Sequence, residues 1–279
     1  MLVTLKEILK IAEEKKIAVG AFNTPNMTSV LAVLSAAEEL GQPVILMHAQ
    51  VHEEMGLCRM SEIAPVMRLF AERACVPVCM HLDHGTDLAY LFEGLKLGFT
   101  SVMYDGAELP MEENVKNTLL AVAEAKKYGA SVEAELGSMG SRESGEGAAA
   151  SIYTDPEEAA RFVAQTGIDA LACAFGTAHG VYLTKPRLDF ERLAQIARIV
   201  PVPLVMHGGS GVSEEDYNRS IELGIRKVNY YTYMAKAAGT AVADMKDKTF
   251  FHDMEIVAKH AMKENVKSAM KIFMRERKN

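Results

Sequence analysis

The sequence lacks the features that mark membrane-spanning and secreted proteins. No apolar run approaches the roughly 20 residues that a membrane-spanning helix requires, and residues 1–7 do not have the charged-then-apolar order of a secretory signal. Cysteine is scarce, and its spacing predicts neither disulfides nor a zinc knuckle; the four copies are Cys58, Cys75, Cys79 and Cys173. We therefore expect a cytoplasmic protein whose thiols are reduced and mostly buried.

An excess of basic residues is also missing. The 30 lysines and arginines are outnumbered by 37 aspartates and glutamates, which gives a net charge of -7 at pH 7. The basic residues are scattered, and the tail at 275–278 is typical of a solvated helix end. This balance argues against general binding to nucleic acid or to a membrane surface, so we expect neither among the partners.

What the sequence does contain is a repeated alternation of helical stretches with short apolar runs. Eight such runs cover residues 17–23, 43–47, 76–81, 99–105, 130–135, 168–174, 202–207 and 225–230. Near-continuous apolar strands are typical of parallel sheets that are buried on both faces. Eight strand–helix units in 279 residues predict an α/β protein, a single (β/α)8 TIM barrel that spans residues 1–279 as one domain. A doubly wound open sheet is the alternative.

The stretches between the runs have the periodicity of amphipathic helices. Residues 87–97 place three leucines on one stripe, with Thr86 as the expected cap and Gly98 as the stop. Glycines end other helical stretches in the same way, at Gly41, Gly129, Gly167 and Gly224. Residues 4–15 precede the first strand and predict an extra N-terminal helix that closes the bottom of the barrel, and further helices follow the last strand.

Three histidines follow apolar runs, at His84, His179 and His207. All strands of a parallel barrel end at the same rim, where catalytic groups gather, so we expect these imidazoles to converge. Three imidazoles with an open fourth position are how a catalytic zinc is held. The sequence therefore predicts a metalloenzyme with these three ligands. His81 lies closer to the strand interior, which favours a structural or supporting role.

Carboxylates accompany the histidines at the same strand ends. Glu135 ends the fifth run and is expected either to bind the metal transiently or to orient a ligand imidazole. Glu133 lies two residues earlier and faces the same side of the strand, but deeper in the barrel, so a supporting role and a purely structural buried carboxylate both remain open. Asp105 is similarly ambiguous. Asp83 adjoins His84 and suits a general acid/base. Its alternative role is the N-cap of the following helix.

Two rim segments have the composition of a phosphate site. A GGSG segment follows the seventh run and contributes Gly208, Gly209 and Ser210, and Asn229 ends the eighth run. Phosphate sites of TIM barrels are commonly built from these two loops and a helix N-terminus. Residues 137–152 are rich in glycine, serine and glutamate, which favours a mobile lid on the catalytic rim; a tolerated surface insertion is the alternative.

Together these motifs resemble those of the class II, zinc-dependent ketose-bisphosphate aldolases, the fructose- and tagatose-1,6-bisphosphate group. The matching segments are GAFN at 20–23, HLDHG at 81–85, VEAELG at 132–137, GTAHGVY at 176–182, HGGSG at 207–211 and KVN at 227–229. Residues 133–211 resemble the tagatose branch most closely. The resemblance implies a lyase that reversibly cleaves a ketose phosphate or 1,6-bisphosphate through a zinc-stabilised ene-diolate. Its products would be dihydroxyacetone phosphate and an aldehyde such as glyceraldehyde 3-phosphate.

The resemblance also implies a role for each matching residue. The three histidines would bind one Zn2+ per subunit, Asp83 would move the proton of the C4 hydroxyl, and Glu143 would handle the proton at C3. Asn23 would lie near the bound substrate. Dihydroxyacetone phosphate would be held by Gly180, Gly208, Ser210, Asn229 and Thr232. The family further implies a homodimer or homotetramer, and often a monovalent cation, Na+ or K+, near the phosphate.

The metal route is favoured over the other aldolase chemistry, which uses a lysine Schiff base. The sixth run ends in AFGT at 174–177 without a lysine, and the nearby Lys185 is in the next loop. Two further interpretations stay open: a metal-dependent phosphosugar epimerase on the same fold, and a non-catalytic sugar-phosphate-binding partner subunit. A pure scaffold would not need the histidine triad and Asp83.

Three positions depart from the family pattern at the aldehyde side or the substrate edges. Relatives carry a DPR-type segment with arginines before the last helix, whereas residues 250–256 (FFHDMEI) contain none, which weakens a dianion site. Tyr231 stands where relatives have Asp or Ala, and Ala49 where they tend to have Ser or Thr. These departures favour the hypothesis of a ketose 1-phosphate substrate with a small, unphosphorylated aldehyde. Alternatively, His252 contacts the distal phosphate.

Overall fold

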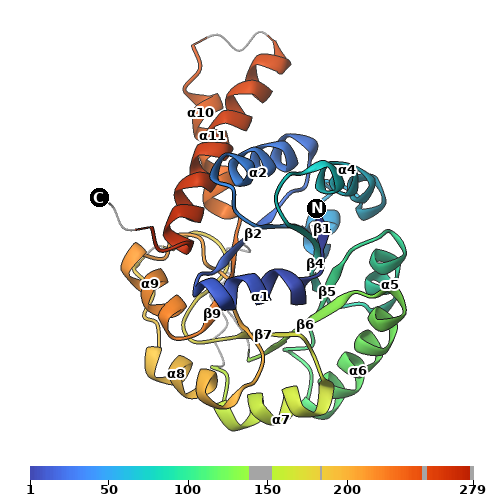
Figure 1. Cartoon of the computed structure of the whole chain (residues 1–279). Helices are drawn as coiled ribbons and strands as arrows, with labels where there is room; N and C mark the ends of the chain where they lie inside the picture. The colour runs from blue at the N-terminus through green and yellow to red at the C-terminus, as the bar shows by residue number, and fades with distance from the viewer. Residues whose placement is uncertain (138–152, 183, 247–249, 277–279) are drawn as a thin grey trace.

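The structure, a computed structural model, describes residues 1–137, 153–182, 184–246 and 250–276. Eight parallel strands form a closed barrel (Figure 1), and each of the eight apolar runs supplies one of them. The strands are β2 (Val19–Asn23), β3 (Val44–Ala49), β4 (Val78–Gly85), β5 (Ser101–Tyr104), β6 (Ser131–Leu136), β7 (Ala170–Cys173), β8 (Leu204–Met206) and β9 (Ile225–Tyr230). Neighbours follow chain order, and the pairing of β9 with β2 closes the ring. The predicted (β/α)8 TIM barrel is confirmed.

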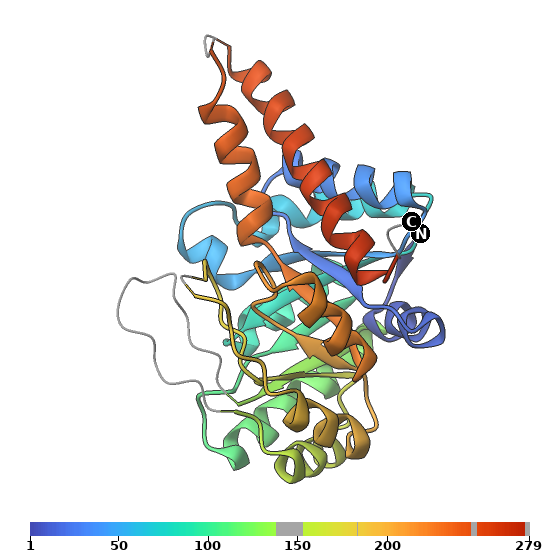
Figure 2. The same ribbon diagram turned by 90° about the vertical axis from the view of Figure 1, so that its left-hand side faces the viewer.

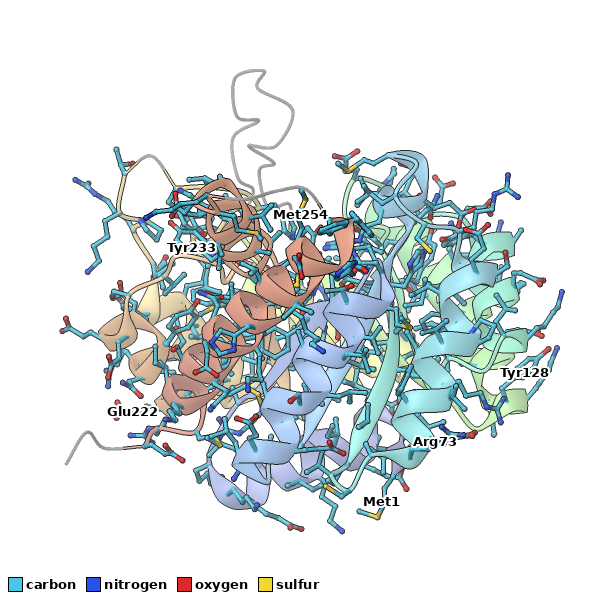
Figure 3. All side chains as sticks on the ribbon, turned by 90° about the horizontal axis from the view of Figure 1, so that it is seen from above. Met1, Arg73, Tyr128, Glu222, Tyr233 and Met254 are labelled. Carbon is cyan, nitrogen blue, oxygen red and sulfur yellow. The ribbon has the colours of Figure 1, made fainter. Side chains whose placement is uncertain are left out.

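Helices cover the outside of the barrel. They are α2 (Met27–Leu40), the short α3 (Gln50–Glu54), α4 (Met60–Arg73), α5 (Leu88–Lys96), α6 (Met111–Tyr128), α7 (Pro156–Thr166), α8 (Phe190–Ile199) and α9 (Glu214–Glu222). Two C-terminal helices follow β9, α10 (Thr232–Ala243) and α11 (Phe251–Phe273). They pack against each other as a hairpin that projects from the barrel (Figure 2), and α11 also lies beside α2 (Figure 3).

An extra helix closes the amino-terminal end of the barrel, as predicted. This helix, α1 (Leu5–Lys15), begins after Thr4, whose side chain forms a capping box with Glu7. Its buried face packs against apolar residues of the barrel strands, among them Ala21, Cys79 and Val205. The two-residue strand β1 (Leu2–Val3) precedes it and pairs with the start of β4.

Helix ends follow the predicted chemistry with small differences. Left-handed glycines cap α2, α6 and α7, at Gly41, Gly129 and Gly167. Asp87, rather than the predicted Thr86, caps α5, because its carboxylate accepts a hydrogen bond from the backbone N–H of Ala89 at 2.8 Å. Gly98 and Gly224 each follow the C-cap residue of their helix by one position.

The cysteines are free, and the prediction that most are buried holds for only two of them. Cys79 and Cys173 are buried, whereas Cys58 is half-buried and Cys75 is exposed. Among the helices that the structure describes, none is long and apolar enough to cross a membrane.

The barrel interior changes character from one end to the other. Alternate side chains of each strand point inward, and near α1 they are apolar, as at Ala21, Cys79 and Val205. Two to four residues further along each strand, the inward-facing side chains are polar and buried. They are Asn23, Asp83 and, directly after β8, His207. The polar cluster is therefore the continuation of the core at the carboxyl ends of the strands, where TIM-barrel active sites lie.

Candidate metal and substrate site

A cavity of about 500 Å³ opens at the carboxyl ends of the strands. Loops after β3, β4, β5, β7, β8 and β9 contribute to its walls. Eleven of the residues predicted to form the metal and substrate site line it: Asn23, Asp83, His84, Asp105, Glu135, His179, Gly180, Gly208, Ser210, Asn229 and Thr232. Its volume is typical of a small-molecule site.

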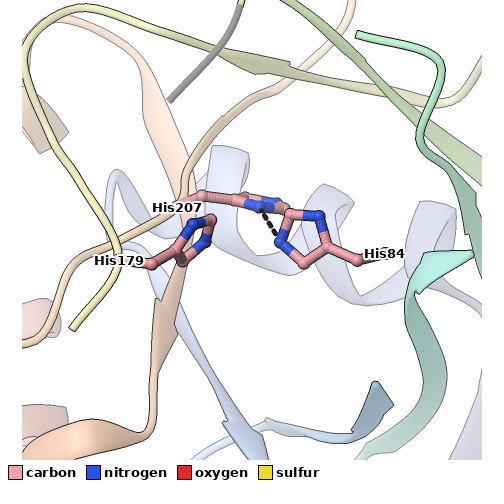
Figure 4. Close-up of side chains that lie close together, drawn as sticks. All are labelled: His84, His179 and His207. Atoms are coloured by element: carbon pink, nitrogen blue, oxygen red, sulfur yellow. Dashed lines mark hydrogen bonds between the residues drawn. The ribbon is translucent and has the colours of Figure 1, made fainter. Parts of the chain in front are cut away.

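The three predicted histidines converge beside this cavity (Figure 4). His84 lies near the end of β4, His179 in the loop after β7, and His207 directly after β8. The ring centroid of His84 is 4.9 Å from that of His179 and 4.6 Å from that of His207. One nitrogen from each ring lies within 4.8 Å of the others, so a single ion can reach all three.

Carboxylates hold two of the rings by the nitrogen that faces away from the cluster. Asp105 Oδ2 lies 2.7 Å from Nδ1 of His84, and Glu133 Oε1 lies 2.8 Å from Nε2 of His207. The remaining nitrogens, Nε2 of His84 and Nδ1 of His207, face each other at 2.9 Å. Carboxylate–histidine contacts of this kind orient metal ligands and fix their tautomers. The three imidazole donors are those that zinc accepts, so these residues fit a zinc ion.

A carboxylate of the same cluster has an oxygen without a hydrogen-bond partner. Oε2 of Glu135 is buried and has no hydrogen-bond partner among the described residues, although Nδ1 of His207 lies 3.7 Å away. Glu135 groups with His84 and Asp105 within metal-binding distance. Burial, together with the negative charge of Asp105, raises the pKa of Glu135 well above its usual value. Burial opposes protonation of His84, yet Asp83 and Asp105 outweigh it and raise the pKa of His84 to about 10. The pocket therefore favours a positive charge at this point.

Asp83 is held by two asparagine side chains. Asn23 donates to Oδ2 at 3.1 Å and Asn229 donates to Oδ1 at 3.0 Å, so both carboxylate oxygens are fixed. Burial alone would raise the pKa of Asp83, but the positive charge of the neighbouring His84 and Lys227 keeps it well below its usual value. An ionised, fixed carboxylate in the cavity is suited to accepting a proton. It lies within β4 and caps no helix.

An irregularity in β4 allows consecutive residues to face the site. The register between β4 and β5 shifts between Leu82 and Gly85, and His84 adopts a left-handed φ of 48°. Strict strand alternation would send His84 to the opposite face from Asp83. The bulge turns His84 towards the cluster instead, and such features are over-represented next to active sites.

A buried charge network supports the cluster from inside the barrel. Lys227 Nζ donates a hydrogen bond to Oε1 of Glu133 at 3.1 Å and lies 2.9 Å from Oε2, and both side chains are fully buried. Nδ1 of His81 lies 2.8 Å from Ser101 Oγ, and its Nε2 lies 3.7 Å from Glu133. Burial would raise the pKa of Glu133, but Lys227 and His207 lower it to about 2. The sequence assigned no role to Lys227. The one available signal was that Lys227 and Asn229 are two residues apart on β9, so their side chains point to the same face of the strand.

We expect Lys227→Met to lower the free energy of unfolding of the metal-free protein by about 3–5 kcal/mol, because it removes the lysine that neutralises the buried charge of Glu133. Urea-induced unfolding at pH 7, followed by circular dichroism, measures this change. The Lys227→Met/Glu133→Gln double variant is the control, and it should recover part of the loss. A single variant as stable as the unmodified protein would show that the ion pair is dispensable.

The glycine loops present backbone to the cavity. Gly180 has a φ of 92°, and Gly208 has a φ of 60° with space so tight that a Cβ atom would lie 2.5 Å from the carbonyl oxygen of Ala178. Only glycine fits at Gly208. Ser210 Oγ accepts a hydrogen bond from the backbone N–H of Tyr231 at 3.0 Å. Gly209 differs from its neighbours, since its N–H donates to the carbonyl of Asn229 and it does not line the cavity.

The other positions named from the sequence differ in where the structure places them. Glu143 and all but the first residue of the predicted lid at 137–152 fall outside the described residues. Ala49 and Tyr231, two of the departures from the family pattern, line the cavity. His252 does not; it lies near the start of α11, with its ring stacked on Phe250 at a centroid distance of 5.5 Å.

A parallel barrel with three converging imidazoles, a fixed carboxylate and glycine loops at its catalytic rim defines an enzyme of the metal-dependent TIM-barrel class. The protein-family model for class II fructose-bisphosphate aldolases matches residues 3–278 of the chain. The chain belongs to this family. It is therefore an aldolase, a carbon–carbon lyase that acts on a sugar phosphate.

Relatives cover nearly the whole chain. The probable fructose-bisphosphate aldolase of Bacillus subtilis is 40% identical over 278 residues, 98% of this chain and 97% of that protein. The crystal structure of the YdjI aldolase from Escherichia coli K12 has a TM-score of 0.88 and 36% identity, covering 98% of this chain and 97% of that one. A putative fructose-1,6-biphosphate aldolase from Coccidioides immitis has a TM-score of 0.87 and 29% identity, with 96% and 95% covered.

Proposed function

We propose that the chain cleaves a ketose phosphate between C3 and C4 to dihydroxyacetone phosphate and an aldehyde, with one zinc ion held by His84, His179 and His207. The observation that carries this proposal is the pair of imidazole nitrogens of His84 and His207, 2.9 Å apart, each with its opposite nitrogen held by a carboxylate. A divalent ion held there supplies Lewis-acid polarisation of the ketose oxygens. Glu135 is the alternate ligand, and Asp105 and Glu133 orient the imidazoles.

Asp83 moves the proton of the C4 hydroxyl in this proposal. In cleavage it accepts that proton as the C3–C4 bond breaks, and in the reverse direction it returns it. The amides of Asn23 and Asn229 hold its carboxylate in place. Glu143, outside the described residues, is proposed for the proton at C3 because of its place in the family pattern.

The phosphate of dihydroxyacetone phosphate binds to the glycine loops in this proposal. The groups that would hold it are Gly180, Gly208, Ser210, Asn229 and Thr232, with Gly209 shaping the turn. Thr232 begins α10, so the positive end of that helix adds to the site. Na+ or K+ near the phosphate, a homodimer or homotetramer, a single domain over residues 1–279 and a cytoplasmic location complete the proposal.

Product analysis tests the proposal. Zinc-loaded protein is incubated with fructose and tagatose 1,6-bisphosphates and with the corresponding ketose 1-phosphates, and the release of dihydroxyacetone phosphate is followed. Release from at least one of them is the expected result. A phosphosugar epimerase would convert the substrate without releasing dihydroxyacetone phosphate, and a non-catalytic partner subunit would consume none of them. Either outcome would contradict the proposal.

A further inference from the structure

One wall of the cavity is formed by α3 and the residue before α10. His52 of α3 lines the cavity although its side chain is only 5% exposed. Its ring lies against that of Tyr231, with centroids 4.8 Å apart and planes inclined by 52°. Tyr231 is one of the departures from the family pattern, and its backbone N–H is anchored by Ser210. The two rings therefore form a fixed surface at the wall of the cavity.

His52 has a polar atom that the protein leaves unsatisfied. Its Nδ1 is buried and has no hydrogen-bond partner among the described residues. Burial lowers the pKa of His52, so its ring is neutral and carries one donor and one acceptor. An unpaired buried polar group is unfavourable unless something else satisfies it. A substrate group in the adjoining cavity is positioned to do so.

The charges around the cavity indicate what kind of group this is. Among its described lining residues there is no lysine or arginine, whereas five are acidic: Glu54, Asp83, Asp105, Glu108 and Glu135. A phosphate dianion is usually met by a guanidinium or an ammonium group. Glu54 and Glu108, which line the cavity, would repel a second phosphate that entered it. The wall suits an uncharged, hydroxylated fragment.

Neighbouring contacts hold this wall in shape. The Gln50 side chain accepts a hydrogen bond from the backbone N–H of Thr86 at 3.1 Å and donates to Glu54 at 3.0 Å. On the far side of α3, the hydroxyl of Tyr90 donates to Glu53 at 2.9 Å. A wall fixed in advance loses little conformational entropy when a ligand binds, which favours selectivity.

We propose that His52, packed against Tyr231, is a specificity-determining residue that hydrogen-bonds a hydroxyl of an unphosphorylated hydroxyaldehyde fragment. The inference rests on the aldol cleavage proposed above, and it names the half of the substrate that the glycine loops do not bind. Ketose 1-phosphates are then preferred over 1,6-bisphosphates. The histidine acts on the aldehyde half alone.

The test compares His52→Leu, which removes the polar atoms at similar size, with His52→Gln, which restores a donor and an acceptor. For cleavage of fructose 1-phosphate, His52→Leu is expected to lower kcat/KM about tenfold, mainly by raising KM. A tenfold change corresponds to the loss of one hydrogen bond to the substrate. His52→Gln should recover most of it. Exchange of the C3 proton of dihydroxyacetone phosphate with solvent needs no aldehyde, so it should stay within about twofold in both variants.

His252→Leu is the matched control, because this histidine is exposed on α11 and does not line the cavity. It should leave both ketose 1-phosphate cleavage and proton exchange unchanged. The inference is overturned if His52→Leu cleaves fructose 1-phosphate normally, if it also impairs exchange, or if the unmodified enzyme strongly prefers a bisphosphate. Absence of both exchange and cleavage in the unmodified, zinc-loaded enzyme would instead overturn the proposed function itself.

Discussion

Asp83→Asn is expected to lower kcat for ketose phosphate cleavage about 10²–10⁴-fold, the range that general acid–base catalysis supplies. The asparagine has nearly the same shape but cannot accept the C4 hydroxyl proton. The two side chains that fix the carboxylate, Asn23 and Asn229, carry amides, which are not bases and cannot take over this role. Steady-state cleavage assays at saturating substrate measure the change.

Two controls separate this chemical role from a structural one. The metal content of the Asp83→Asn variant should equal that of the unmodified protein, because Asp83 is not among the proposed ligands. Exchange of the C3 proton of dihydroxyacetone phosphate should also persist, since that step does not involve the C4 hydroxyl. A variant that loses exchange and cleavage to the same extent would show that Asp83 supports the site as a whole.

His207→Ala is expected to abolish detectable cleavage and to weaken zinc binding by more than about 10²-fold. Loss of a group that only supports a ligand already costs about 10–100-fold in metal affinity, and loss of the ligand itself exceeds this. The affinity is measured by competition with a chelator of known strength. His207 is fully buried, so its removal also leaves Glu133 without one of its contacts.

Glu133→Gln is the matched variant for His207→Ala. It keeps the imidazole but weakens the contact that orients it, so zinc affinity should fall about 10–100-fold while cleavage persists at saturating zinc. The ranking of the two variants is therefore the prediction. If His207→Ala bound zinc as tightly as Glu133→Gln, the assignment of His207 as a ligand would be wrong.

The fold could be predicted from the sequence because its signals are local. Each strand is a short apolar run, and glycine or side-chain caps mark the ends of several helices, so the sequence predicts all eight barrel strands to within a few residues. Histidines directly after such runs must share a rim in a parallel barrel. This topological rule brought His84, His179 and His207 together without any knowledge of distances.

The supporting contacts could not be predicted because they join residues far apart in the chain. The pairing of Lys227 with Glu133 depends on the register of β9 and β6, which are separated by β7 and β8 in the barrel. Nothing in the sequence around either residue identifies the other as its partner. The contact of His52 with Tyr231 joins the loop after β3 to the loop after β9. The bulge in β4 that turns His84 inward has no local sequence signal.

The account depends on a dication bound by three imidazoles, and the metal dependence of cleavage tests it most directly. Elemental analysis of active, purified protein should find about one zinc ion per chain. Dialysis against a chelator should abolish the release of dihydroxyacetone phosphate, and added zinc should restore it. Undiminished cleavage by protein shown to be free of transition-metal ions would contradict the account.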